Sequence, residues 1–142
     1  MYYFAYGSNM SFEQMRKRCP GNQFVGRAKL FGYKFVYDGH SSARSGAVAN
    51  IIKSDKVTVW GALFEVNDEC IKNLDRYEGY PTSYQRESMV VEDEQGSKYE
   101  ALIYLREPRE EGAPSNEYRA ILLEGARDCG LPEEYINGFI RA

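Results

Sequence analysis

The sequence predicts an α+β fold: a strongly curved, barrel-like sheet of about six strands with helices packed around it. Short runs rich in aromatic and β-branched residues recur along the chain, and aromatic residues make up 14% of it. The strands predicted between residues 24 and 66 follow one another without a crossover helix, which a doubly wound parallel sheet would require. The length of 142 residues suits one hydrophobic core, so we expect a single domain over residues 1–142.

The N-terminal residues run from an aromatic strand directly into a turn. Residues 2–6 have the composition of a β-strand, and Gly7–Asn9 are residue types that tolerate unusual backbone angles. Ser11 and Gln14 have the spacing of a capping box, which predicts a helix over residues 12–18. Such a turn at a helix N-terminus offers backbone N–H donors to a carboxylate or an oxyanion. An ordinary strand-to-helix connection is the alternative.

The next segment predicts three strands. Residues 24–37 form one long or bent strand, with aromatic residues alternating on one face. Residues 38–46 have almost nothing to bury and are expected to be a loop that flanks or covers a site. Two further strands, residues 47–52 and 58–66, are expected on either side of the polar turn 53–56.

The remainder of the chain predicts a helix, a hairpin and two more helices. Asn67 is a typical N-cap, and Gly79 ends the helix that it opens. The hairpin strands are expected at residues 84–93 and 98–106, and the last helices after Ser115 and from Glu133.

Composition narrows the possible partners. The net charge of −3 and the pI near 5.3 argue against a nucleic-acid or anionic-membrane partner, because either would require a basic face. The three cysteines are widely spaced and in no paired motif, which predicts reduced thiols. No basic leader and no apolar run of about 18 residues is present. We therefore expect a cytoplasmic protein, a monomer or a homodimer, with a small-molecule partner.

The sequence lacks the residues that several classes of catalytic site require. His40 is the single histidine, so neither a metal site nor a Ser-His-Asp triad is supported. Ser8 lacks the Gly-x-Ser-x-Gly surroundings of a nucleophile elbow and is interpreted as a turn residue or a ligand contact. Gly-rich phosphate loops are absent as well, and no cofactor is expected.

Among the carboxylates, Glu78 is the strongest candidate for proton transfer. It lies between Tyr77 and Tyr80 at a predicted helix C-terminus, where the helix dipole and apolar surroundings both raise a carboxyl pKa. The alternative is a surface glutamate at a frayed helix end. Tyr118 begins the apolar stripe of its helix, so its ring is expected in the core.

Several short motifs resemble, in one order, the γ-glutamylcyclotransferase-like family. They are Tyr6-Gly7-Ser8-Asn9-Met10 after a strand, the segment 59–66, Leu74-Asp75-x-x-Glu78-Gly79, and Pro114-Ser115-x-x-Tyr118 followed by Gly125-Ala126 and Gly130-Leu131-Pro132. The resemblance covers nearly the whole chain and implies a mixed, barrel-like sheet. It also implies that Glu78 is the general acid/base and that Tyr6, Gly7, Ser8, Asn9, Met10 and Tyr118 bind substrate.

The resemblance implies a reaction that needs no protein nucleophile. Such enzymes convert a γ-glutamyl amide into 5-oxoproline and a free amine, with the α-amine of the substrate as nucleophile. The amine remains open: a cysteine-containing dipeptide, a γ-glutamyl-lysine isopeptide and an acyl-carrier substrate all fit. A non-catalytic module of the same fold that binds a small carboxylate is the alternative function.

Overall fold

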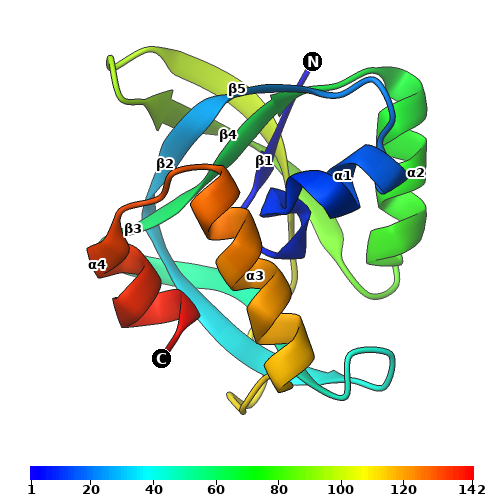
Figure 1. Cartoon of the computed structure of the whole chain (residues 1–142), viewed down its shortest axis with the longest axis vertical. Helices are drawn as coiled ribbons and strands as arrows, with labels where there is room; N and C mark the ends of the chain where they lie inside the picture. The colour runs from blue at the N-terminus through cyan, green and yellow to red at the C-terminus, as the bar shows by residue number, and fades with distance from the viewer.

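The computed structural model describes residues 1–142 and contains a closed, mixed β-barrel with helices packed around it (Figure 1). The strand order is β1-β3-β2-β4-β5, and the barrel closes by the parallel pairing of β1 with β5; the other pairs are antiparallel. The strands are β1 (Tyr2–Ala5), β2 (Gln23–Ser41), β3 (Gly46–Glu65), β4 (Gln85–Asp93) and β5 (Lys98–Leu105). This confirms the predicted α+β barrel, with one strand fewer than the sequence indicated.

The missing strand results from the continuity of β3. The two strands predicted on either side of residues 53–56 are one strand, and the predicted turn between them is wrong. The polar residues 53–56 form an irregularity in the hydrogen-bonded ladder between β2 and β3. Tyr33 pairs with Lys53, and the next pair joins Phe31 to Thr58. A bulge of this kind bends a long strand without ending it, which a small closed barrel requires.

The predicted loop 38–46 is also mostly strand. β2 continues to Ser41, and only residues 42–45 form the turn that leads into β3. Asp38 is fully buried, and its carboxylate lies 2.7 Å from the Arg106 guanidinium. The charge of a buried carboxylate can be compensated by a paired cation inside the protein. The polar character of Asp38 therefore did not indicate a solvent-exposed loop, contrary to the expectation from the sequence.

The helices follow their predicted signals closely. They are α1 (Phe12–Arg18), α2 (Asp68–Glu78), α3 (Asn116–Asp128) and the short α4 (Glu133–Tyr135), which continues as a π-helical turn, Ile136–Ile140. The side chains of Ser11, Asn67 and Ser115 each accept the N–H of the third residue beyond them, as N-caps do. Gly79 ends α2 in the left-handed conformation, with φ of 67°. None of the helices has the length and apolarity needed to cross a bilayer.

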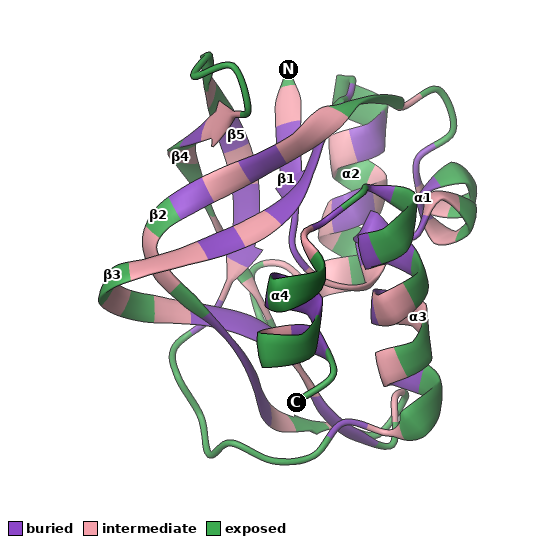
Figure 2. Cartoon of the chain, turned by 60° about the vertical axis from the view of Figure 1, so that its left-hand side comes forward, coloured by how far each residue is buried: buried purple, intermediate pink, exposed green.

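The core fills the barrel and continues beneath the helices. Buried residues alternate with more exposed ones along parts of β2 and β3 (Figure 2). Phe4, Phe64 and Ile103 are fully buried on three different strands, and Leu122 joins them from α3. This packing fixes α3 beside the turn that follows β1.

Two of the three cysteines are paired, which contradicts the expected reduced thiols. The sulfur atoms of Cys19 and Cys70 lie in covalent contact, with their Cα atoms 4.9 Å apart, and join the end of α1 to α2. Cys129 is free and buried. The two partners are 51 residues apart in sequence, so only the packing of α1 against α2 brings them together.

Candidate active site

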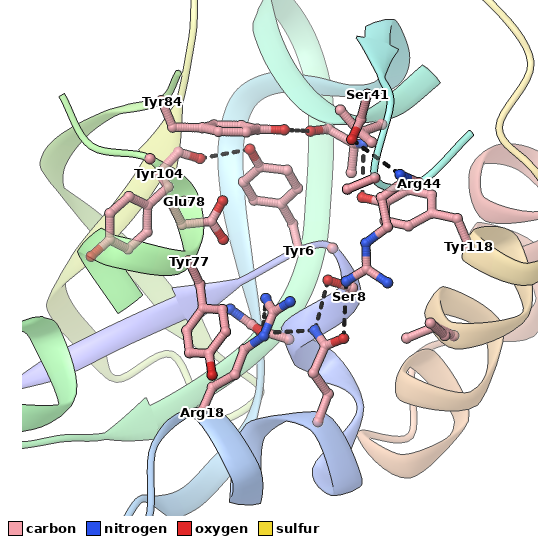
Figure 3. A pocket seen from close by; sticks show the side chains of 18 of the residues that line it. Tyr6, Ser8, Arg18, Ser41, Arg44, Tyr77, Glu78, Tyr84, Tyr104 and Tyr118 are labelled. Carbon is pink, nitrogen blue, oxygen red and sulfur yellow. Dashed lines mark hydrogen bonds between the residues drawn. The ribbon is translucent and has the colours of Figure 1, made fainter. Parts of the chain in front are cut away.

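A cavity of about 920 Å³ lies where several segments meet (Figure 3). Its walls come from the turn after β1, from α1, the end of α2, the β2–β3 hairpin, the residues before β4, the end of β5 and α3. The cavity brings together Glu78, Tyr118 and the turn Gly7–Asn9, which are far apart in sequence.

The turn Ser8–Met10 is a single 3-10 turn directly before α1. Its own hydrogen bonds are donated by the N–H groups of Met10 and Ser11, to Gly7 and Ser8 respectively, each at 3.0 Å. The turn therefore makes no use of the N–H groups of Gly7, Ser8 and Asn9. Free donors beside a cavity suit a carboxylate or an oxyanion.

Side chains around the turn hold its shape. Gln14 Nε2 donates to Ser8 Oγ at 2.7 Å and to Asn9 Oδ1 at 2.8 Å. Asn9 is buried and donates from Nδ2 to the Tyr3 hydroxyl at 3.0 Å. The capping box is thus only half formed, because the Gln14 side chain braces the turn instead of returning to the Ser11 backbone.

Met10 stands apart from the other residues proposed to bind substrate. It is fully buried, does not line the cavity and packs against Gly125 of α3. Tyr6, Gly7, Ser8, Asn9 and Tyr118 all line the cavity. In the motif that ends at Met10, the last residue therefore anchors the turn to the core.

Glu78 is the last residue of α2, and its carboxylate points into the cavity (Figure 3). No protein group donates a hydrogen bond to it. Burial raises the pKa of Glu78 to about 7, against the opposing effects of Arg18, Arg44 and Arg106. A carboxyl group with this pKa exists in both protonation states near neutral pH, as a general acid/base requires.

Tyrosine hydroxyls surround the carboxylate, and most have their proton engaged. Tyr6 donates to the carbonyl of Tyr104 at 2.6 Å, and Tyr84 donates to the carbonyl of Ala49 at 2.7 Å. The Tyr118 hydroxyl instead accepts the N–H of Ala49 at 3.0 Å, so its own proton has no acceptor in the protein. Burial raises the pKa of Tyr118 to about 12, which keeps the phenol neutral and able to donate.

Arginines were missed by the sequence reasoning. Arg18, Arg44 and Arg106 line the cavity, and they come from α1, from the β2–β3 hairpin and from the residue after β5. Arg18 lies four residues after Gln14, so helical spacing on α1 was a usable signal that both face the same site. Neither Arg44 nor Arg106 carried a local signal, because only the closed barrel brings their segments to the cavity.

His40 also lines the cavity, but it makes no hydrogen bond to another side chain. Ser8 Oγ accepts a hydrogen bond from Gln14 Nε2, and no hydrogen bond joins it to His40. No group of three or more histidine, cysteine or acidic side chains is arranged to hold a metal ion.

Comparisons with known proteins agree with this geometry. Residues 58–139 match the sequence profile of the AIG2-like family. The mouse protein named γ-glutamylcyclotransferase is 32% identical over 94% of this chain and 73% of its own length, and the human protein of that name is also 32% identical, with the same coverage. A solved structure titled γ-glutamyl cyclotransferase superposes with a TM-score of 0.93 at 30% identity, covering 100% of this chain and 86% of that one.

Proposed function

The chain belongs to the AIG2-like, γ-glutamylcyclotransferase family, and from this premise we propose that it cyclises a γ-glutamyl amide to 5-oxoproline and releases an amine. One observation supports the proposal above others. The Glu78 carboxylate has no partner in the protein and faces a cavity that also contains free amide donors and a neutral tyrosine hydroxyl.

The first half of the reaction forms the lactam ring. Ionised Glu78 accepts a proton from the α-ammonium group of the substrate, and the freed amine attacks the γ-carbonyl carbon. A C–N bond forms, and the carbonyl oxygen gains negative charge. The Tyr118 hydroxyl, which has a proton to donate, stabilises this oxyanion.

The second half releases the amine. Glu78 passes its proton to the leaving nitrogen as the original amide C–N bond breaks and the carbonyl re-forms. Two protons leave the former ammonium nitrogen and two reach the leaving nitrogen, so Glu78 acts twice and ends ionised. The reaction consumes no water and needs no covalent adduct with the protein.

The turn Gly7–Asn9 holds the α-carboxylate of the substrate in this proposal. Arg18 Nη1 donates to Asn9 Oδ1 at 3.2 Å and places a permanent positive charge beside the turn. A permanent charge suits a carboxylate, which stays charged throughout the reaction, better than a transient oxyanion.

Replacing Glu78 with glutamine tests the proposal. Glu78→Gln keeps the size of the side chain but cannot accept a proton, so 5-oxoproline release should fall by about ten-thousandfold or more while substrate binding persists. Wild-type activity should rise as pH increases through about 7, because the carboxylate accepts a proton only when ionised. Glu124→Gln is the matched control, since Glu124 lines the same cavity but is exposed.

The measurements are 5-oxoproline release from a panel of γ-glutamyl amides and ligand affinity by calorimetry. A Glu78→Gln variant within roughly tenfold of wild type would remove Glu78 from the mechanism. Wild-type protein that binds γ-glutamyl compounds but releases no 5-oxoproline would favour the carboxylate-binding module instead.

A further inference from the structure

The last turn of α2 contains a second carboxylate, Asp75, three residues before Glu78. Asp75 does not line the cavity, and 23% of its side chain is exposed. The helix dipole disfavours a negative charge at this end of a helix, so an acid here needs a compensating partner. Both carboxylate oxygens of Asp75 have such a partner on the β4–β5 hairpin.

The two partners are Arg86 and Tyr104. Asp75 Oδ2 forms an ion pair with Arg86 Nη1, and Asp75 Oδ1 accepts the hydroxyl of Tyr104 at 2.6 Å. Arg86 on β4 and Tyr104 on β5 pair directly across the hairpin, so their side chains lie on the same face of the sheet. One carboxylate of α2 therefore binds two neighbouring strands at once. We call these three residues the α2 clamp.

The clamp also fixes the backbone where α2 ends. The carbonyl of Asp75 accepts the N–H of Tyr80 at 2.9 Å, and the Arg86 guanidinium lies 4.3 Å from the centre of the Tyr80 ring. Glu78 lies between Asp75 and Tyr80 in sequence. Because no protein group donates a hydrogen bond to the Glu78 carboxylate, its position depends on how firmly this part of the backbone is held.

Tyr104 connects the clamp to the other wall of the cavity. Its carbonyl accepts the hydroxyl of Tyr6 at 2.6 Å, and its ring packs edge to face against Tyr3. The Tyr3 hydroxyl in turn accepts the side chain of Asn9, in the turn after β1. The Tyr104 hydroxyl points away from the Glu78 carboxylate, so it serves the clamp and not the reacting groups (Figure 3).

We propose that Asp75 is a positioning residue: with Arg86 and Tyr104 it fixes the last turn of α2 and so holds the Glu78 carboxylate at the substrate. This inference rests on the proposed function. Neither Asp75 nor Arg86 lines the cavity, so neither contacts a substrate bound there. Their effect on the reaction passes through the position of Glu78, and a misplacement of about 1 Å can cost about a hundredfold in rate.

Arg86→Gln tests the inference from outside the cavity. It removes the cation from Asp75 and leaves every residue that lines the cavity unchanged. The kcat for 5-oxoproline release should fall by about ten- to a hundredfold, while KM stays within about twofold of wild type. Arg86→Lys should recover part of kcat, because it keeps a cation for Asp75. Asp75→Asn keeps an acceptor for Tyr104 but loses the ion pair, so it should lower kcat in the same way.

Asp93→Asn is the matched control. Asp93 Oδ2 accepts the hydroxyl of Tyr99 at 3.2 Å, so this pair repeats the bond between Asp75 and Tyr104 at the other end of the same hairpin. Neither Asp93 nor Tyr99 lines the cavity. The control should keep the wild-type kcat. Thermal melts of all variants separate a change in kcat from a loss of folded protein.

Amide hydrogen exchange, measured by NMR, tests the clamp without turnover. The N–H groups of Gly79 and Tyr80 close the end of α2, and they should exchange faster in Arg86→Gln than in wild type. Faster exchange together with no 5-oxoproline from wild type would keep the clamp and reject the proposed cyclisation. Exchange that stays at the wild-type rate would overturn the inference, and so would a wild-type kcat in both Arg86→Gln and Asp75→Asn.

Discussion

Glu78 combines two environments with opposite effects on its ionisation. The wall of the cavity removes water from the carboxyl group, which raises its pKa, while three nearby arginines lower it. The balance leaves the pKa at about 7. Because the arginines lower this pKa, they keep more of the carboxyl group ionised at neutral pH, so we expect the cavity cations to support the proton transfer as well as the binding.

Tyr118 combines a structural and a proposed chemical function in one hydroxyl group. Tyr118→Phe leaves the N–H of Ala49 without its acceptor, so we expect a loss of about 1–2 kcal/mol of stability even though the ring still packs. It also removes the proton proposed to stabilise the oxyanion, so kcat should fall by about a hundredfold. Thermal melts and steady-state kinetics measure the two effects separately.

Tyr37→Phe is the control for this prediction. Tyr37 packs edge to face against Tyr118, and its hydroxyl donates to the carbonyl of Ile140 at 2.7 Å, but it does not line the cavity. This variant should lose stability with little change in kcat. If Tyr118→Phe behaves in the same way, Tyr118 contributes only to structure.

Residues with a local signal could be predicted from the sequence, and others could not. Glu78 stood out because it ends a recognisable helix between two aromatic residues, and the turn stood out because of its residue types. Arg44 had no such signal: it lies in a segment that reads as an ordinary polar loop. Met10 is the opposite case, since its place in a motif suggested a ligand contact and its packing shows an anchor.

Gly125 couples α3 to the turn Ser8–Met10 and the residue after it. A Cβ atom at this position would contact the Ser11 backbone nitrogen and would lie 2.7 Å from the Met10 Cβ. Gly125→Ala should therefore push α3 away from the turn and cost about 1–3 kcal/mol, despite the better helix propensity of alanine. Because α3 carries Tyr118, activity should fall as well.

Gly138→Ala is the matched control. Gly138 lies in the π-helical turn after α4, and a Cβ atom there would meet nothing within 4 Å. Its stability and activity should stay close to wild type. A Gly125→Ala variant as stable and active as Gly138→Ala would contradict the prediction. It would show that α3 can move away from the turn without loss of stability or activity.

Helices whose ends are marked by capping residues were predicted closely from the sequence. The long strands β2 and β3, whose course depends on the barrel, were not. The caps at Ser11, Asn67 and Ser115 fixed the starts of three helices, because a cap is a contact within four residues. Residues 53–56 and 38–41 have the composition of turns or loops, yet they lie in long strands. Their conformation depends on the bending of the β2–β3 pair around the core and on the burial of Asp38 against Arg106. These contacts join residues that are far apart in sequence, so a short stretch of sequence does not reveal them.

At the scale of the whole molecule, closure of the barrel builds the site. The parallel pairing of β1 with β5 and the antiparallel pairing of β1 with β3 place the turn after β1 opposite the end of α2. These contacts join the first residues of the chain to residues near positions 64 and 101, so sequence periodicity could indicate strands but not their order. The family resemblance implied a mixed, barrel-like sheet, whereas the hydrophobic pattern of the sequence did not show which strands pair.

The raised pKa of Glu78 also predicts how the stability of the whole molecule depends on pH. A carboxyl whose folded pKa is about 7, against an ordinary value of 4.5, binds its proton more tightly in the folded state. The folded protein is therefore destabilised progressively as pH rises from about 4.5 to about 7, by at most about 3 kcal/mol, and the full cost remains above that range.

Glu78→Gln removes this cost because the amide is neutral at every pH. The variant should unfold at higher denaturant concentration than wild type at pH 8, and the difference should shrink as pH falls and vanish near pH 4. Glu124→Gln, at an exposed position on the same cavity, should show no such trend. A Glu78→Gln variant as stable as wild type at pH 8 would mean that the carboxylate is well solvated in the folded state. Its pKa would then be ordinary, and the proposed proton transfer near pH 7 would lose its physical basis.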